Sequence, residues 1–435
     1  MNNLIERAQK LLRELNNRTV VAQTLITDIK YLPCDYKTDN TLPELSAMQS
    51  FDGKWGGAND THAWFSFDID APSDNNIRNE VFVDSGVNGW DLSNPQFLVY
   101  VDGKIAQGLD TNHRSFVVNS GKHTVYLYAY AGYQISPLFA ADFPLEIFDY
   151  NNPLTLSATL QAVDTRVETL SADLFVMLNT LSAINVNTKQ YADILRYVNT
   201  ALNMVDFVDV RLDDFGKCCK KAHTYLKNEY FGRYCKRGNT SVSCVGHTHI
   251  DVAWLWPVRQ TREKAQRSFA TVLTLMDRYP DYKFMSSQCY LYKAVKEEAP
   301  ELYERIKQRV AEGRWDVEGA MWLEADCNLI SGESLVRQIL YGKRFMKREF
   351  GVDSKVLWLP DVFGYSAALP QILKQSGVET FVTSKISWND TNVLPYDMFR
   401  WKGLDGSEVF TYFLTAPADA NNPKDIHTNY NAIAN

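Results

Sequence analysis

The chain has no long apolar run, no basic stripe and no regular cysteine spacing, and each absence excludes a class of protein. No apolar stretch approaches the roughly 20 residues of a membrane span, and the polar start of the chain has no apolar core typical of a signal peptide. The 45 basic and 52 acidic residues are dispersed and give a net charge of −7. We therefore expect neither a membrane nor a nucleic acid as a partner.

The cysteines give no sign of a disulfide framework. Their number, seven, is odd, and the adjacent pair Cys218 and Cys219 is not a C-x-x-C motif. Reduced thiols in a cytoplasmic protein are the simplest interpretation. Aromatic residues make up 13% of the chain, a share that suits sugar binding and an ordinary aromatic core equally well.

The 435 residues suffice for two or three domains, and the pattern of apolar residues changes twice before residue 240. Residues 1–59 begin with apolar side chains at helical spacing and are interpreted as a helical lead-in. Residues 60–150 contain short alternating runs between turn signals, which predicts an antiparallel β-sandwich. Residues 151–235 return to a helical pattern and are expected to form a helical linker region.

Apolar, strand-like runs alternate with amphipathic helices through residues 240–435. Such alternation predicts a parallel sheet or a β/α barrel. Gly313, Gly351 and Gly377 stand where helix C-caps are expected. The expected strands are 241–246, 315–319, 355–360, 379–384 and 408–414, and the expected helices are 262–279, 297–312, 332–350 and 367–376. We thus expect a multidomain protein that ends in a β/α catalytic domain, incomplete at its C-terminal end.

The segment His247-Thr248-His249-Ile250-Asp251 alternates two histidines with an aspartate directly after an apolar run. In extended backbone, side chains two positions apart share a face, so His247, His249 and Asp251 are expected to point the same way. Imidazole and carboxylate groups together suit a divalent cation, zinc first. For this motif alone, two satisfied histidines beside a capping aspartate are an equally good interpretation.

Two further acidic motifs follow expected strands. Asp361 ends a buried apolar run and precedes an aromatic residue and a glycine turn, which puts a carboxylate at the mouth of the fold. After the expected strand 315–319, one possible face carries Trp322, Glu324 and Asp326. The plain alternatives are a helix N-cap for Asp361, a solvated loop for the other two acids and core packing for the tryptophan. Three such clusters at successive strand ends favour a shared site.

The run from His247 to Trp254 and the later segment Leu359-Pro360-Asp361-Val362-Phe363-Gly364 resemble glycoside hydrolase family 38, the α-mannosidases. The resemblance is closest to the cytosolic and vacuolar branch, specific from about 240 to 415, and looser upstream. It implies a cytoplasmic, retaining glycosidase that hydrolyses α-mannosidic bonds in oligosaccharides with a divalent ion, usually zinc. The implied partner is an oligosaccharide or mannoside substrate, and a homo-oligomer is an option for the full-length form.

The resemblance also implies roles for the residues of the motifs. By motif position, His249 and Asp251 would be metal ligands, and Asp361 would be both the nucleophile and a metal ligand. His247 would contact the metal ligands without binding the metal itself. A retaining glycosidase needs a carboxylate that attacks the anomeric carbon, and a cation beside it would bind sugar hydroxyls and keep the carboxylate ionised.

Four more residues are carried over as substrate-binding. Trp254 and Phe363 would line the mannose subsite, where an aromatic face suits the apolar face of a pyranose. Lys385 falls where the family has a basic residue near the nucleophile. Asp326 matches an acidic position on the wall of the subsite.

Two features of the family have no match in this sequence. The fourth metal ligand, a histidine, and the general acid are both expected downstream of the nucleophile. His427 is the histidine available there, and its neighbours do not resemble that site, so we interpret it as a surface-loop residue. Asp390, Asp397 and Asp419 are available acids without a supporting motif. We therefore expect the chain to be the N-terminal part of a longer enzyme, with an incomplete active site.

Two other functions stay open. A metal-dependent deacetylase or amidohydrolase would also place histidine and aspartate at strand ends, but it needs a water-activating base in place of a nucleophile loop such as that around Asp361. A non-catalytic carbohydrate-binding fragment would instead act through the sandwich of residues 60–148.

Overall fold

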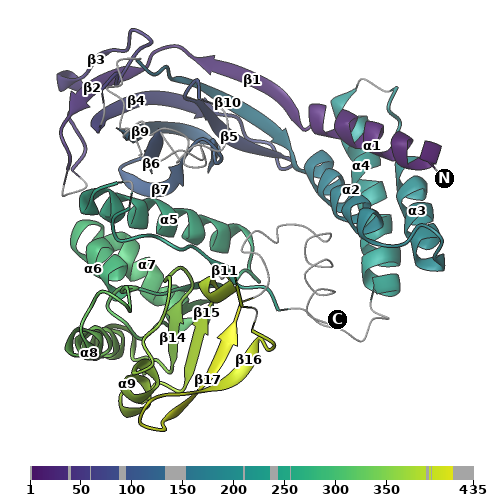
Figure 1. Cartoon of the computed structure of the whole chain (residues 1–435). Helices are drawn as coiled ribbons and strands as arrows, with labels where there is room; N and C mark the ends of the chain where they lie inside the picture. Colours follow the sequence, from purple (N-terminus) through teal and green to yellow (C-terminus); the bar gives the residue numbers. More distant parts are fainter. Residues whose placement is uncertain are drawn as a thin grey trace.

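The computed structural model describes ten segments of the chain and has a mixed α/β fold. A two-sheet sandwich lies above, a helical group lies beside it, and a sheet with flanking helices lies below (Figure 1). No described helix is long and apolar enough to cross a membrane. The described segments are residues 2–37, 41–58, 60–87, 95–132, 153–208, 211–235, 243–254, 256–387, 391–392 and 394–414.

The sandwich consists of two antiparallel sheets with an apolar core between them. The larger sheet has the strand order β3-β2-β4-β9-β6-β7, and the smaller has the order β1-β10-β5-β8. Phe65 and Phe97 of the larger sheet and Val81 and Phe116 of the smaller sheet are buried in this core. The strands are β1 (Val20–Ile26), β2 (Lys30–Cys34), β3 (Gln49–Ser50), β4 (Thr61–Ala71), β5 (Ile77–Asp84), β6 (Gln96–Val101), β7 (Lys104–Leu109), β8 (Ser115–Val118), β9 (Gly121–Ala131) and β10 (Ser157–Asp164).

The helical lead-in that we expected over residues 1–59 is wrong beyond its first helix. Helix α1 (Asn2–Asn17) ends early, and the next residues form β1 and β2, which join the two sheets. The run Val-Val-Ala-Gln-Thr-Leu-Ile of β1 is rich in strand-forming residues, and pairing with β10 decides its conformation. Likewise, residues 151–235 begin with the strand β10 before their helices start. The sandwich therefore also includes strands that come before residue 60 and after residue 150 in the sequence.

Helices α2 (Thr165–Ala183), α3 (Lys189–Leu202) and α4 (Leu212–Tyr225) pack with α1 into a separate helical group, and a π-helix (Leu226–Tyr234) continues α4. Leu170, Leu174 and Met177 of α2 are fully buried in this group, as the helical spacing predicts. Asp164 caps α2, because its carboxylate accepts a hydrogen bond from Arg166 N.

The lower region contains parallel strands that alternate with helices, as predicted. One sheet has the order β11-β12-β13, and the other has the order β14-β15-β17-β16, with β16 antiparallel. A parallel bridge between Gly319 and Leu357 joins the two sheets. The strands are β11 (Gly246–His247), β12 (Phe284–Ser286), β13 (Trp315–Val317), β14 (Val356–Leu359), β15 (Thr380–Thr383), β16 (Met398–Lys402) and β17 (Glu408–Phe413). The helices are α5 (Val258–Arg278), α6 (Cys289–Glu298), α7 (Pro300–Ala311), α8 (Gly332–Phe350) and α9 (Leu369–Gln375).

The expectations for this region differ from the structure at a few points. Strands β12 and β16 were not expected, and β12 has only three residues, too few for a periodic signal. The expected helix 297–312 begins after α6, with Pro300 at the start of α7. Of the expected strand 241–246, residues 241 and 242 lie outside the described residues, and of the rest only Gly246 belongs to a strand, β11. The barrel-like closure of this region remains a prediction.

Helix α5 packs directly against the larger sheet of the sandwich, so the two regions share one core (Figure 1). Trp64 and Tyr128 of the sheet and Phe269 and Leu273 of α5 belong to the same buried cluster. The sheet is thus covered on both faces, and this explains why β4 is buried almost continuously instead of at alternate positions.

A buried polar network lies in the same interface. Glu263 of α5 is 4% exposed and contacts His62 Nε2 at 3.0 Å, Tyr128 Oη at 3.1 Å and Arg267 Nη1 at 3.4 Å. Arg267 Nη2 also donates to Gln260 Oε1 at 3.2 Å. Because buried charges are tolerated only when paired and hydrogen-bonded, the network fixes how α5 sits on the sandwich.

Candidate metal centre

Three side chains converge where two parallel strands end. His249, Asp251 and Asp361 each offer a ligand atom, and these atoms lie within 4.8 Å of one another. His249 Nε2 is 3.3 Å from Asp251 Oδ1 and 3.6 Å from Asp361 Oδ2. The first two residues follow β11, and Asp361 follows β14. One imidazole nitrogen and two carboxylates at such spacing suit a divalent cation, so this donor set fits the ion that the sequence implies.

His247 is not among the three residues of the cluster, and its sharing of a face with His249 and Asp251 stays a prediction. Strand β11 ends at His247. His247 Nδ1 lies 3.0 Å from the carbonyl oxygen of Met285, and its Nε2 accepts a hydrogen bond from Trp358 Nε1 at 3.2 Å. Both ring nitrogens are engaged, and burial lowers the pKa of His247. The residue therefore ties β11 to β12 and β14 as a neutral imidazole, and Trp358 is a hydrogen-bond donor as well as a packing residue.

Lys385 and Phe363 lie beside Asp361. Lys385 Nζ is 2.8 Å from Asp361 Oδ1 and 5.3 Å from the centre of the Phe363 ring. The Phe363 side chain is 64% exposed, so its ring is accessible to a ligand. The two carboxylate oxygens of Asp361 thus face different groups, one toward His249 and the other toward Lys385.

The loop after Asp251 is held by helix α5. Thr261, fully buried near the start of α5, donates its hydroxyl to Asp251 O at 3.1 Å and accepts a hydrogen bond from Ala253 N at 3.0 Å. Ala253 has a positive φ of 70°, which is uncommon for a residue with a side chain. Trp254 follows, 52% exposed, with its ring edge-on to that of Trp256 at 5.5 Å. The loop therefore presents an accessible tryptophan beside the cluster.

Glu324 is a site residue whose role the sequence reasoning missed. Its Oε2 lies 3.0 Å from His249 Nδ1, on the opposite side of the ring from the two aspartates, and its Oε1 accepts a hydrogen bond from Ser287 Oγ at 2.8 Å. Burial opposes the charged imidazole, but Asp251 and Glu324 outweigh it and raise the pKa of His249 to about 10. The sequence places Glu324 on a possible shared face with Trp322 and Asp326, but its contact with His249 joins distant segments and leaves no signal in the sequence.

Other expected residues lie apart from the cluster or outside the described residues. Asp326 is exposed, and its Oδ1 accepts hydrogen bonds from the backbone N–H groups of Asn328 at 2.8 Å and Leu329 at 2.9 Å, which is a local turn. A role for Asp326 at the subsite wall remains a prediction. Asp390, Asp419 and His427 lie outside the described residues, and Asp397 lies just before β16.

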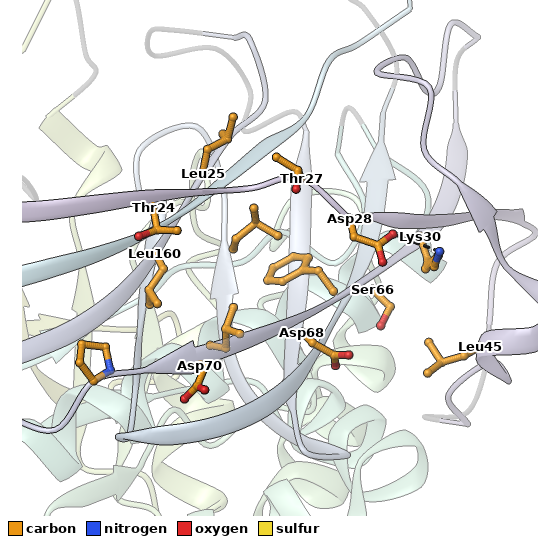
Figure 2. Close-up of a pocket in the computed structure, with 14 residues that line it drawn as sticks. Thr24, Leu25, Thr27, Asp28, Lys30, Leu45, Ser66, Asp68, Asp70 and Leu160 are labelled. Atoms are coloured by element: carbon orange, nitrogen blue, oxygen red, sulfur yellow. Dashed lines mark ion pairs between the residues drawn. The ribbon is translucent and has the colours of Figure 1, made fainter.

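A groove on the sandwich bears on the carbohydrate-binding alternative. It has a volume of about 460 Å³, and strands β1, β4 and β10 contribute most of its lining (Figure 2). Asp28, Asp68 and Asp70 line it with Lys30, and Phe67, the single aromatic residue of the lining, is 3% exposed. The groove thus offers no accessible ring face to a sugar, and none of its lining residues belongs to the cluster of His249, Asp251 and Asp361.

The chain is similar in sequence to several known proteins. Residues 239–435 match the glycosyl hydrolases family 38 N-terminal domain. The chain is 36% identical to alpha-mannosidase G of Dictyostelium discoideum over 86% of this chain and 33% of that protein. It is 31% identical to an alpha-mannosidase of Saccharomyces cerevisiae over 87% of this chain and 35% of that protein, and 32% identical to alpha-mannosidase 2C1 of Mus musculus over 80% and 33%. A solved alpha-mannosidase from Enterococcus faecalis V583 matches with a TM-score of 0.35 and 21% identity, over 44% of this chain and 22% of that one.

Residues 239–435 match the N-terminal domain of glycosyl hydrolases family 38, so the resemblance stated from the motifs is confirmed. The chain spans about a third of the length of the curated relatives that it matches.

Proposed function

We propose that the protein is a retaining α-mannosidase that hydrolyses α-mannosidic bonds in oligosaccharides, with Asp361 as its nucleophile. The observation that carries the proposal is the convergence of His249, Asp251 and Asp361 within 4.8 Å at two strand ends of a family 38 domain. Because the chain spans about a third of its relatives, we assign the activity to the whole protein, with these 435 residues as its N-terminal part. We further propose that the lower sheet is the first part of a β/α barrel and that the protein is cytoplasmic.

The proposed chemistry proceeds in two displacements. A carboxylate oxygen of Asp361 attacks the anomeric carbon, the glycosidic bond breaks, and the leaving oxygen takes a proton from a general acid outside the described site. Water then attacks the glycosyl ester and gives its proton back to the general acid, which releases the sugar with retained configuration and frees the carboxylate. Lys385, 2.8 Å from Asp361 Oδ1, orients the carboxylate.

We propose zinc as the divalent cation, held by His249, Asp251 and Asp361. Bound there, it would supply a positive charge that binds sugar hydroxyls and favours distortion of the ring. The exposed rings of Trp254 and Phe363 would contact the apolar face of the mannose.

Turnover of aryl α-mannosides tests the proposal. The whole protein with zinc should release the aryl group, and the Asp361→Asn variant should lose several orders of magnitude in kcat because an amide forms no glycosyl ester. A matched control is Asp353→Asn, since Asp353 also pairs with a lysine, Lys343, at 3.1 Å but lies away from the cluster. Cleavage of an N-acetyl substrate without mannoside turnover would support a deacetylase instead.

A further inference from the structure

Three residues that have no role in the proposed function lie behind the candidate cation site. They contact one another and the motif of His249. Ser287 and Gln288 follow strand β12, and Glu324 follows β13. Their side chains are directed toward the segment of His249, between the ends of β11 and β13.

Gln288 connects two strand ends through its side-chain amide. Its Nε2 donates a hydrogen bond to Ile250 O at 2.8 Å, and its Oε1 accepts one from Glu324 N at 3.2 Å. Ile250 lies between His249 and Asp251, so one amide fixes the backbone of the two proposed ligands and that of Glu324. The amide nitrogen donates and the amide oxygen accepts, as their chemistry requires. The Gln288 side chain is buried, with 4% of the residue exposed.

Gln288 makes these bonds from a strained backbone conformation. Its φ is 65°, in the region that is unfavourable for a residue with a side chain. Ala320, between β13 and Glu324, has a φ of 58°, and Ala253 follows the motif with a φ of 70°. Among the described residues, five non-glycine residues have a positive φ, and three of them lie in the loops around this site. Such strain persists where surrounding contacts over-determine the conformation.

Glu324 carries the connection to His249. Ser287 Oγ fixes one carboxylate oxygen at 2.8 Å, and the other lies 3.0 Å from His249 Nδ1. Among the described residues, His249 Nδ1 and Glu324 Oε2 are both buried without a hydrogen bond, and the 3.0 Å between them pairs each with the other by charge. A carboxylate at one imidazole nitrogen keeps the proton there and turns the other nitrogen toward a cation. Here the other nitrogen, Nε2, faces Asp251 and Asp361.

We propose that Ser287, Gln288 and Glu324 form a positioning bracket that holds His249 with Nε2 directed at the cation. Gln288 fixes the main chain, Ser287 fixes the carboxylate, and Glu324 fixes the ring. This proposal rests on the cation site of the proposed function, which the same experiment tests separately.

The test is the zinc affinity of the metal-stripped protein, measured by competition with a chromophoric chelator. Glu324→Gln should weaken zinc binding about 10–100-fold. Gln288→Met, which keeps the length of the side chain but removes both hydrogen bonds, should weaken it about 3–30-fold. The unfolding midpoint of each metal-free variant measures any loss of stability. The loss of zinc affinity supports the bracket only where it is larger than this loss of stability explains.

The chain offers two matched controls. Glu318 also accepts a hydrogen bond from a serine hydroxyl, that of Ser354, but does not contact His249. Gln338 accepts a hydrogen bond from Leu323 N at 3.1 Å, one residue before Glu324, without reaching the segment of His249. Glu318→Gln and Gln338→Met should therefore keep zinc affinity within about threefold of the wild type.

The outcomes separate the bracket from the proposed function. Wild-type protein that binds no divalent cation would overturn the cation site itself. Tight binding by the wild type together with unchanged affinity in Glu324→Gln and Gln288→Met would overturn the bracket alone. Equal losses in the bracket variants and in the two controls would also overturn it, because general loosening of the loops would then explain the effect.

Discussion

Asp361 and Lys385 form a short ion pair, with Oδ1 and Nζ 2.8 Å apart, on the side of the carboxylate that faces away from His249. The lysine follows β15 and the aspartate follows the neighbouring parallel strand β14, so the pair depends on adjacent strand ends. This arrangement leaves the second oxygen of Asp361 directed at the proposed cation.

Loss of the lysine should therefore slow turnover without unfolding the protein. Lys385→Met is expected to lower kcat for an aryl α-mannoside about 10–100-fold, because the carboxylate loses the charge that orients it. Lys343→Met is a matched control, since the Lys343 side chain is also 16% exposed and pairs with Asp353 at 3.1 Å. Equal activity in the two variants would contradict the role of Lys385.

The interface between α5 and the sandwich should depend on its buried ion pair. Arg267→Met leaves the carboxylate of Glu263 buried beside fewer donors, so we expect the free energy of unfolding to fall by about 3 kcal/mol. Arg309, which pairs with Asp277 and Glu312 at the surface, provides the control, and Arg309→Met should cost less than about 1 kcal/mol. Urea unfolding of both variants measures the difference, and similar losses would argue against a special role for the buried pair.

Lys264 should make stability depend on pH. Burial, with Arg267 nearby, lowers the pKa of the Lys264 amine from 10.5 to about 7. Between these values the unfolded chain binds more protons than the folded one, so this residue destabilises the fold fully below pH 7 and progressively less as the pH rises toward 10.5. Lys264→Met should therefore stabilise the protein at pH 6. Because solvent still reaches part of the Lys264 side chain, the gain should be less than the full pKa shift implies, on the order of 2 kcal/mol.

The gain from Lys264→Met should shrink at pH 9.5, when the wild-type amine is neutral in the folded chain. Urea unfolding at the two pH values measures this. A gain that is the same at pH 6 and pH 9.5 would mean that packing, not charge, explains the effect.

The 435-residue chain alone should be a poor enzyme. Within the described residues the cation has three candidate ligands, and the rings of Trp254 and Phe363 are largely exposed. A site with few ligands binds its ion weakly. We expect little or no turnover of an aryl α-mannoside with added zinc, and a tendency to aggregate. A soluble monomer with robust turnover would show that these residues suffice.

The sequence predicted the lower region better than the upper one. Alternating strands and helices have strong periodic signals, and Gly351 ends α8 in a left-handed conformation, with a φ of 75°, where a C-cap was expected. The strand β1 was missed because its conformation depends on pairing with β10, which follows it by more than a hundred residues. Propensity in the local sequence cannot reveal such pairing.

The site was only partly predictable for a similar reason. His249, Asp251 and Asp361 were named from motifs, and the structure brings them together. The sharing of one face by His247 stays a prediction, and its ring contacts Met285 and Trp358 instead of joining the cluster. Glu324 and Gln288 act through contacts between loops, and no spacing rule connects them to His249.

The most direct test of the central claim is to trap the glycosyl ester on Asp361. Whole protein is treated with an activated fluoro-mannoside whose ester hydrolyses slowly, then digested, and the labelled peptide is sequenced by mass spectrometry. We predict that the mass of one fluorinated hexosyl group appears on Asp361 and that the product of normal turnover retains its anomeric configuration. A label on another residue, or an inverted product, would contradict the account.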